Sequence, residues 1–276
     1  MATPFIKWVG GKTQILPHLL DLFPRKARTY YEPFLGGGAV FFALAAEQRF
    51  ERAVLSDTNR ELMDAYRVVR SFPDDLMRLL RGMESDYALA PEPTYAKWQK
   101  PAKELADSLV TQPSSRAARF IFLNKAGYNG QYRVNRRGEF NVPRADRTTV
   151  TTFDADNLQD CSTTLDRWAS LRHGDFATVL AEAQPDDLIY LDPPYYQDTA
   201  KSFGYDEQLR LARVFRELVA RGCYVVASNT DLPPVRILYQ GFEIHPVEVR
   251  RFGRNAYRQG NGAGVINDVI IVGRRG

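Results

Sequence analysis

A glycine-rich turn between two apolar segments is the feature that most constrains what this chain can fold into. Residues 30–34 (YYEPF) can form a strand, Gly36, Gly37 and Gly38 follow as a turn, and residues 39–46 (AVFFALAA) are typical of a helix. A second strand is expected at residues 53–56 and ends at Asp57. Strand, glycine turn, helix, strand and acid in this order indicate an α/β fold with parallel strands, of the kind that binds nucleotides.

The same alternation returns in the last third of the chain. There the sequence predicts a strand, a helix capped by Gly222 and a second strand, at residues 188–191, 206–220 and 224–227. Two further extended segments, at residues 242–249 and 267–272, are expected to form a hairpin that closes the sheet.

Residues 58–170 do not follow this alternation of strands and helices. Helices are predicted at residues 61–70, 74–84 and 117–125, with a proline-punctuated stretch at 91–113. Residues 128–143 are rich in Gly, Asn and Arg, which indicates a hairpin or an exposed loop. We therefore predict a largely helical inserted domain at 58–170, within a domain built from residues 1–57 and 171–276.

The tetrapeptide Asp192-Pro193-Pro194-Tyr195 directly follows an apolar run at residues 187–191 that is expected to be a buried strand. Two consecutive prolines fix two φ angles and keep the residue before each out of helical space, so the acid and the ring are held rigidly. Taken alone, the pair could be a proline-rich turn that closes a strand. Rigid polar groups at a strand end favour a functional site.

Two common phosphate-binding motifs are incomplete in this chain. A GxGxxG fingerprint would need glycine at position 41, which is Phe41, and a P-loop before Lys12 would need glycine at position 6, which is Ile6. Asp57, at the end of the second strand, could accept hydrogen bonds from both hydroxyls of a ribose, or cap the following helix. Lys12 offers a cation for a carboxylate, and Trp8 offers a flat apolar face.

Composition excludes several classes of protein. The 276 residues carry a net charge of +4 and are 44% hydrophobic and 12% aromatic, which fits a folded globular chain. No apolar run approaches the roughly 18 residues of a membrane span, and no signal-peptide pattern is present. Cys161 and Cys223 lack CxxC spacing, so neither a disulfide framework nor a zinc site is expected, and the cytoplasm is the predicted compartment. Arginines cluster at residues 133–147 and 250–258, which suits phosphates and base edges or a solvated face.

Six ordered motifs resemble those of the Dam-type DNA adenine N6-methyltransferases. They are FIKWVGGK (5–12), EPFLGGG (32–38), LSDTN (55–59), LNKAGYNGQYRVNRRGEFNVP (123–143), GDF (174–176) and YLDPPY (190–195). Their order, with the glycine motif first and DPPY last, resembles the α group of that family. The resemblance implies a class I methyltransferase with a Rossmann-like, seven-stranded sheet that binds S-adenosylmethionine. Residues 58–170 would be the target-recognition domain for double-stranded DNA.

The resemblance also implies roles for individual residues. The cofactor contacts would be Trp8, Lys12, Phe34, Gly36, Gly38, Asp57, Asp175, Phe176 and Asp192, with Lys12 suited to the methionine carboxylate, Asp57 to the ribose, and Asp175 and Phe176 to the adenine end. The DNA-binding set would be Lys7, Tyr128, Asn129, Gln131, Arg133, Arg136, Arg137 and Pro143. Arg133 could form a bidentate pair with a guanine edge.

The chemistry of adenine methylation fits the DPPY tetrapeptide. The lone pair of the adenine N6 amine is delocalised into the ring, so two hydrogen bonds to Asp192 and the Pro193 carbonyl would help to direct it at the methyl group. Tyr195 would stack on a base that has left the duplex. No metal is expected, because a sulfonium methyl is already activated.

Other activities remain open on the residues alone. The same fold could methylate cytosine N4, RNA or a protein amide, or could be a catalytically silent DNA-binding protein. Gln131 stands where relatives usually have leucine, and Arg144-Ala145 replaces a common aromatic-glycine pair, so a GATC target is only a weak default. The resemblance further suggests a monomer in a bacterial or phage-type system, which could include a cognate restriction endonuclease.

Overall fold

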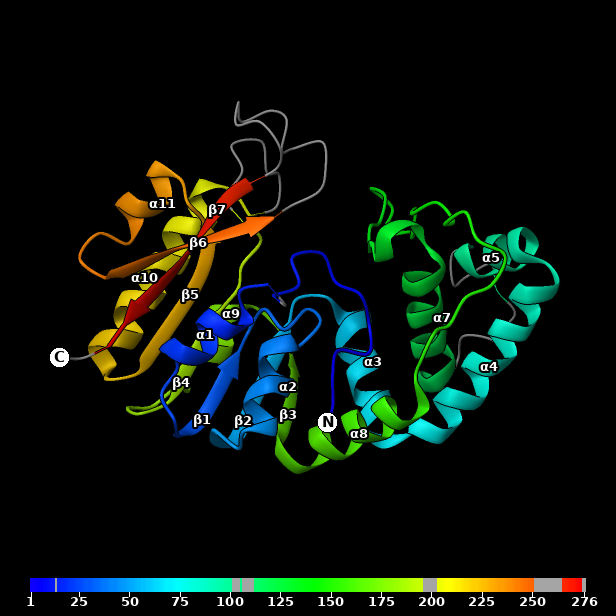
Figure 1. The fold of residues 1–276 in the computed structure, drawn as a ribbon, viewed down its shortest axis with the longest axis horizontal. Coiled ribbons are helices and arrows are strands. Elements are labelled where there is room, and N and C mark those ends of the chain that lie inside the picture. The colour runs from blue at the N-terminus through cyan, green and yellow to red at the C-terminus, as the bar shows by residue number, and fades with distance from the viewer. Residues whose placement is uncertain (13, 101–104, 106–111, 196–202, 251–264, 275–276) are drawn as a thin grey trace. The chain divides into compact units, whose positions relative to one another are not determined.

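The computed structural model describes residues 1–12, 14–100, 105, 112–195, 203–250 and 265–274 (Figure 1). Contacts divide the chain into two compact units. Unit 1 comprises Met1–Gly11, Gly36–Ala46 and Asp57–His173, and unit 2 comprises Lys12–Leu35, Glu47–Ser56 and Gly174–Gly276. The predicted boundaries between a catalytic and a DNA-binding domain stay predictions.

A seven-stranded sheet has the order β3-β2-β1-β4-β5-β7-β6. Strand β1 pairs in parallel with β2 and β4, and β4 pairs in parallel with β5, whereas β7 is antiparallel to both β5 and β6. The sheet and its C-terminal hairpin are therefore confirmed. The strands are β1 (Ala27–Glu32), β2 (Phe50–Asp57), β3 (Ala169–His173), β4 (Leu188–Leu191), β5 (Tyr224–Thr230), β6 (Glu243–Arg250) and β7 (Val265–Gly273).

Unit 1 is largely helical, as predicted for residues 58–170. Its α-helices are α2 (Ala39–Ala46), α3 (Arg60–Ser71), α4 (Pro73–Leu89), α5 (Pro91–Gln99), α7 (Pro113–Ala126) and α8 (Ala155–Trp168). Helix α5 lies in the proline-punctuated stretch at 91–113, for which no helix was predicted. Pro91 stands at the first helical position, where its missing N–H removes no intrahelical hydrogen bond and its fixed φ suits a helix. Pro73 and Pro113 begin α4 and α7 in the same way.

Residues 128–143 form a short 3-10 helix, η2 (Tyr128–Gly130), followed by a tight turn. Val134 and Phe140 make an antiparallel bridge, and the Asn135 N–H donates to the Glu139 carbonyl at 2.8 Å. The segment, predicted to be a hairpin or an exposed loop, thus contains a turn closed by one bridge, and a second antiparallel bridge joins the flanking residues Gly127 and Arg144.

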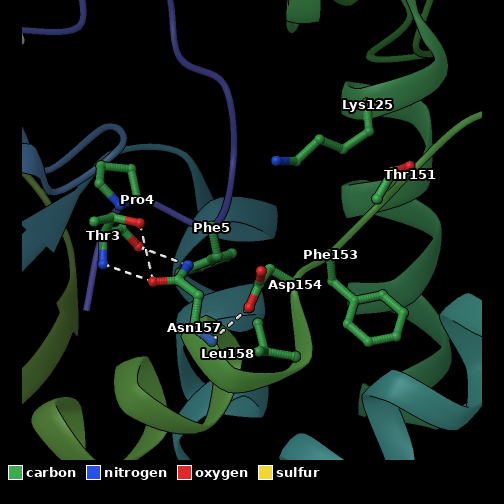
Figure 2. Close-up of a pocket in the computed structure, with 9 residues that line it drawn as sticks. All are labelled: Thr3, Pro4, Phe5, Lys125, Thr151, Phe153, Asp154, Asn157 and Leu158. Atoms are coloured by element: carbon green, nitrogen blue, oxygen red, sulfur yellow. Dashed lines mark hydrogen bonds between the residues drawn. The ribbon is translucent and has the colours of Figure 1, made fainter. Parts of the chain in front are cut away.

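Unit 1 also contains a cavity of about 320 Å³ beside the N-terminal segment (Figure 2). Asn157 accepts hydrogen bonds from the backbone and the hydroxyl of Thr3, and Lys125 extends toward the open space. Burial lowers the pKa of Lys125, and the nearby charge of Lys7 lowers it further. The lining residues are Thr3, Pro4, Phe5, Lys125, Thr151, Phe153, Asp154, Asn157 and Leu158.

Unit 2 packs its helices against the central strands. They are α1 (Leu16–Leu22), α9 (Phe176–Leu180), α10 (Tyr205–Arg221) and α11 (Pro233–Leu238). All four residues of β4 are buried, as expected for a parallel strand covered on both faces. Helix α10 ends at Gly222, whose φ of 95° confirms the predicted cap. A core cluster that includes Ile189, Leu211 and Phe215 joins α10 to the sheet.

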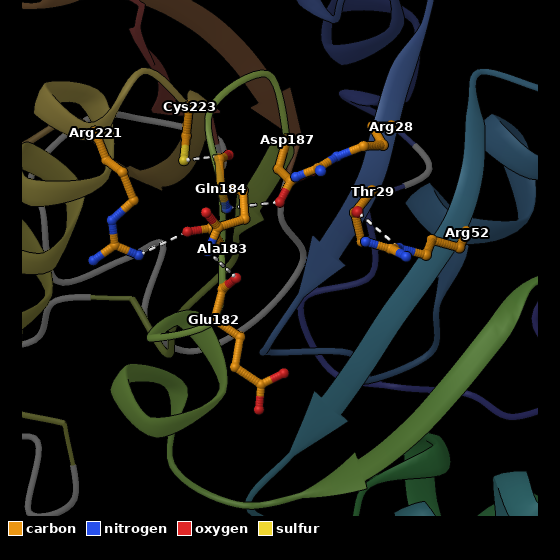
Figure 3. A network of polar contacts seen from close by, with 9 residues as sticks. All are labelled: Arg28, Thr29, Arg52, Glu182, Ala183, Gln184, Asp187, Arg221 and Cys223. Atoms are coloured by element: carbon orange, nitrogen blue, oxygen red, sulfur yellow. Dashed lines mark hydrogen bonds and ion pairs between the residues drawn. The ribbon is translucent and has the colours of Figure 1, made fainter.

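A polar network holds the amino ends of the parallel strands in unit 2 (Figure 3). Arg28 of β1 pairs with Asp187, which precedes β4, at 3.2 Å between Nη2 and Oδ1. The same carboxylate accepts the Gln184 N–H at 2.8 Å. The carboxyl ends of these strands, where the DPPY tetrapeptide begins, lie at the opposite edge of the sheet.

Among the described residues, none of the helices combines the length and the apolar character that a membrane crossing needs.

Candidate active site

The Asp192 carboxylate stands at the carboxyl end of β4 and is held by two donors. The register of β4 with β5 pairs Leu191 with Ala227, so that Asp192 follows next to Ser228. Ser228 Oγ donates to Asp192 Oδ1 at 2.8 Å, and Lys12 Nζ lies 2.6 Å from Asp192 Oδ2. The side chains of Lys12 and Asp192 are 8% and 18% exposed. Charges this deeply buried are stable only when paired and hydrogen-bonded, so this pair fixes both groups.

The rest of the tetrapeptide is also held in place. Lys12 Nζ lies 4.8 Å from the centroid of the Tyr195 ring, a cation–π distance. Pro193 is buried, and the Pro194 carbonyl accepts a hydrogen bond from Gln208 Nε2 at 3.0 Å. The structure thus brings together Lys12 and the three residues predicted to be catalytic.

A second group of predicted residues in unit 2 surrounds the start of α9. The rings of Phe34 and Phe176 are 5.4 Å apart. Asp175 caps α9 by accepting the Ala177 N–H at 3.0 Å, and its carboxylate is paired with Arg210, which lowers its pKa. The Arg210 guanidinium lies 4.5 Å from the Phe176 centroid. Arg210 therefore contacts both residues that were expected near the adenine end of the cofactor.

The remaining residues predicted to contact the cofactor meet in unit 1. The Gly36 N–H donates to Asp57 Oδ2 at 3.1 Å, and the Asn59 N–H donates to Oδ1 at 2.9 Å. Trp8 packs directly against Gly36, whose φ is +50°, and Gly38 has a φ of 71°. Burial raises the pKa of Asp57. A half-buried Trp, a glycine backbone and a carboxylate are therefore gathered in one place.

The structure excludes one interpretation of Asp57. Helix α3 is capped by Asn59, whose side chain accepts the Leu62 N–H at 3.1 Å. Asp57 is therefore not the N-cap, and its carboxylate instead joins the end of β2 to the glycine turn.

The N-terminal segment and the end of α7 are tied together by one buried side chain. Asn124 accepts the Lys7 N–H at 3.0 Å and donates to the carbonyls of Lys7 and Gly130 at 2.8 and 2.9 Å. The Tyr128 N–H donates to the Pro143 carbonyl at 2.9 Å. Lys7, Asn129 and Pro143 are exposed, as is Tyr128 at 52%.

Arg133 is exposed and bonded to the other side of the turn. Its Nε donates to Asn141 Oδ1 at 2.8 Å and its Nη2 to the Asn141 carbonyl at 2.9 Å. Arg136 and Arg137 are exposed, and Gln131 is half-buried. Residues 251–258 of the second arginine cluster lie outside the described residues.

Several residues at these places were not predicted. Ser228, Gln208 and Asn229 support the DPPY tetrapeptide, and the Tyr132 ring stacks on Trp8 with centroids 5.9 Å apart. Ser228 could have been found by pairing the two predicted strands, which places it beside Asp192. None of the predicted site residues lines the cavity of unit 1. Within the described ranges no group of three His, Cys, Asp or Glu side chains could hold a metal ion, and the expected lack of a metal stays a prediction.

Comparison with known proteins identifies the family. A sequence model described as D12 class N6 adenine-specific DNA methyltransferase matches residues 8–252. Type II methyltransferase M1.LlaDCHI of Lactococcus lactis subsp. cremoris is 32% identical over 97% of this chain and 94% of its own length. Type II methyltransferase M.MjaIII of Methanocaldococcus jannaschii is 35% identical, covering 90% and 91%. The DNA adenine methylase of Escherichia coli K12 is 32% identical, covering 90% and 87%.

These matches extend over nearly all of the chain and include the glycine turn, the 128–143 segment and the DPPY tetrapeptide. The predicted adenine specificity is confirmed, and the alternatives of cytosine, RNA or protein-amide methylation and of a silent binding protein are set aside. The chain belongs to the family of D12 class N6 adenine-specific DNA methyltransferases.

Proposed function

We propose that Asp192, Pro193 and Tyr195 are the catalytic residues with which this enzyme methylates adenine N6 in DNA. The observation that carries the proposal is the Asp192 carboxylate, which is fixed by Ser228 and Lys12 beside the Tyr195 ring. A carboxylate so held is a pre-oriented hydrogen-bond acceptor, and such groups need no reorganisation when charge develops.

The proposed mechanism follows from the electronic structure of adenine. Asp192 and the Pro193 carbonyl accept the two hydrogens of the amine, which draws the nitrogen lone pair out of conjugation and toward the methyl group. The negative charge of Asp192 stabilises the positive charge that develops on N6, and the extra proton leaves to water after the N–C bond has formed. Tyr195 stacks on the base, which offsets part of the few kcal/mol required to take it out of the duplex.

The cofactor is S-adenosylmethionine, which when bound supplies an electrophilic sulfonium methyl group. Asp57 fits it because a carboxylate has about four lone-pair directions, and the hydrogen bonds from Gly36 and Asn59 leave acceptor capacity for ribose hydroxyls. The positive charge of Lys12, which is paired with Asp192, also suits the methionine carboxylate. The full proposed set is Trp8, Lys12, Phe34, Gly36, Gly38, Asp57, Asp175, Phe176 and Asp192.

For the DNA, we propose that residues 58–170 form the target-recognition domain and that residues 1–57 and 171–276 form the catalytic domain. The exposure of Tyr128, Asn129 and Arg133 supports contact with double-stranded DNA by the segment that follows α7. Arg133 would read a guanine edge by releasing its contacts to Asn141. The proposed contacts are Lys7, Tyr128, Asn129, Gln131, Arg133, Arg136, Arg137 and Pro143.

We further propose that the enzyme acts as a cytoplasmic monomer. The names of the two type II relatives support a place in a restriction–modification system with a cognate endonuclease. Size-exclusion chromatography with light scattering, with and without duplex DNA, tests the monomer.

The decisive experiment combines labelled methyl transfer from S-adenosylmethionine to unmethylated genomic DNA with single-molecule sequencing of the product. We expect N6-methyladenine in one short sequence motif. Asp192→Ala should abolish transfer while cofactor binding, measured by calorimetry, is partly retained. The matched control is Asp64→Ala, which removes another paired aspartate, 2.7 Å from Arg67, and should keep transfer near the wild-type rate. Substantial turnover by Asp192→Ala would refute the role of Asp192.

A further inference from the structure

We infer that Ser228 and Gln208 are positioning residues that hold the two ends of the DPPY tetrapeptide in its catalytic geometry. The inference rests on the catalytic role proposed for Asp192. Neither side chain takes part directly in methyl transfer. Both act through the groups that they orient.

The hydrogen bonds around Ser228 have a single consistent direction. An ionised carboxylate only accepts, so the one hydroxyl proton of Ser228 must point at Asp192 Oδ1, 2.8 Å away. The Tyr190 hydroxyl, 3.0 Å from Ser228 Oγ, must then donate to Ser228. Hydrogen bonds thus run from Tyr190 through Ser228 to Asp192. This relay holds one oxygen of the carboxylate in place and so restricts its rotation.

A second relay reaches the other end of the tetrapeptide. Asn229 Nδ2 donates to Gln208 Oε1 at 3.0 Å, and Gln208 Nε2 donates to the Pro194 carbonyl at 3.0 Å. Gln208 lies on α10, and its amide bridges β5 to the peptide that precedes Tyr195. The carbonyl of Pro194 is thus anchored to the sheet through one side chain.

Both relays pass through β5, at the neighbouring residues Ser228 and Asn229. Successive side chains of a strand point to opposite faces, so Ser228 reaches Tyr190 and Asp192 on one face, while Asn229 meets α10 on the other. Tyr190, Ser228, Gln208 and Asn229 are at most 1% exposed. A buried polar network whose hydrogen bonds are made specifies one geometry, because any displacement leaves a buried polar group unpaired. The tetrapeptide is therefore held from both sides of the sheet.

The consequence for the reaction concerns rate rather than binding. A shift of about 1 Å in a group that orients the reacting atoms can cost on the order of 100-fold in rate. Removing either anchor should slow methyl transfer within the bound complex and leave the affinity for the cofactor nearly unchanged.

The first test uses single-turnover methylation with saturating cofactor and a DNA duplex that carries the target motif. Ser228→Ala should slow the transfer step by about 10- to 100-fold, with cofactor affinity, measured by calorimetry, within about threefold of wild type. Ser228→Thr keeps the hydroxyl and should recover most of the rate. The matched control is Ser162→Ala, which deletes another buried serine hydroxyl, bonded to the Arg70 carbonyl at 2.9 Å.

Two outcomes overturn the role of Ser228. One is a transfer rate for Ser228→Ala within about threefold of that of Ser162→Ala. The other is a loss of rate that Ser228→Thr does not recover and that an equal loss of cofactor affinity accompanies, because that pattern indicates general damage to the fold.

Gln208→Met tests the hydrogen bond from Gln208 to the Pro194 carbonyl. It also keeps the positioning inference testable if Ser228→Ala does not fold. It keeps the side-chain length but removes both hydrogen bonds, and should slow transfer by about 10- to 100-fold. Its control is Gln159→Met, which deletes the 2.7 Å hydrogen bond to Asp74. A rate equal to that of the control refutes the role of Gln208.

Asp192→Ala in the same assay distinguishes a failure of the catalytic role of Asp192 from a failure of the positioning roles of Ser228 and Gln208. If it transfers methyl groups at the wild-type rate, the catalytic role of Asp192 fails, and with it the basis for positioning residues. If it is inactive while Ser228→Ala and Gln208→Met match their controls, only the positioning inference fails.

Discussion

Gly36→Ala tests whether the glycine turn exists to let Trp8 approach the backbone. A Cβ atom at position 36 would lie 2.6 Å from Trp8 Cδ1 and 3.0 Å from Nε1, and the φ of +50° is one that L side chains rarely adopt. The left-handed conformation costs about 1–2 kcal/mol for a residue with a Cβ, and overpacking costs about 1–3 kcal/mol more. We therefore expect Gly36→Ala to lower the free energy of unfolding by about 2–5 kcal/mol.

The chain offers a control that separates these two costs. Gly138 also has a positive φ, +77°, but a Cβ there would meet nothing within 4 Å. Gly138→Ala should therefore cost only the conformational part, about 1–2 kcal/mol. In a Trp8→Ala background the collision is gone, so Gly36→Ala should then cost about as much as Gly138→Ala.

Urea unfolding of the four variants and the wild type measures these differences, and calorimetry measures their affinity for S-adenosylmethionine. Because the indole must move to admit a methyl group, Gly36→Ala should also weaken cofactor binding by at least about tenfold, equivalent to about 1.4 kcal/mol. Equal unfolding costs for Gly36→Ala and Gly138→Ala in the wild-type background would refute the reasoning. So would a cost at Gly36 that Trp8→Ala leaves unchanged.

Three further predictions concern single side chains. Arg133→Ala should lose about 1–3 kcal/mol of discrimination at one base pair of the target, and an unchanged preference profile on duplexes varied one position at a time would contradict this. The pKa of Asp57 is raised from 3.8 by burial, and hydroxyl donors favour its ionised form, so cofactor affinity should fall as the pH drops through that raised value; calorimetry at several pH values should show no such fall in Asp57→Asn. The pKa of Asp175 is lowered from 3.8 by Arg210, so the stability that this pair contributes is present above 3.8 and is lost as the pH falls through the lower value. Because both side chains are about 40% exposed, Arg210→Gln should cost less than about 1 kcal/mol in urea unfolding near pH 7, and a cost that persists at the acid limit would show another cause.

The order of elements could be predicted because apolar runs, glycines and helix caps leave local signals. Their ends could not always be predicted, because pairing with a neighbour decides them. Strand β1 was expected at residues 30–34 but runs from Ala27 to Glu32, where Ala27 pairs with Phe50 and Glu32 with Leu55. Pro33 has no N–H to donate to the ladder, so the strand ends at Glu32, its last paired residue. The polar residues Arg28 and Thr29 belong to the strand because they join a network at its amino end.

In the candidate site, too, the residues could be predicted from the sequence, but the contacts between them could not. Motifs located Trp8, Gly36 and Asp57 separately, but the hydrogen bond between Gly36 and Asp57 depends on the path of the chain between them. Asn59, two residues beyond Asp57, caps α3 instead, and both residues have the side-chain oxygen that a cap requires. Only the position at which the helix begins shows which of the two residues is the cap.

Lys12 gives the physical reason why partners are harder to predict than residues. The sequence presents it as a cation behind two glycines that could meet any carboxylate, and the resemblance assigns it to the methionine end of the cofactor. In the structure its ammonium is buried and pairs with Asp192, because a desolvated charge is tolerable only beside an opposite charge. A sequence specifies that a buried cation needs an anion, and the fold determines which anions come within reach. Since Lys12 contacts both Asp192 and Tyr195, any change in the partner of Lys12 also changes the electrostatic environment of the proposed catalytic carboxylate.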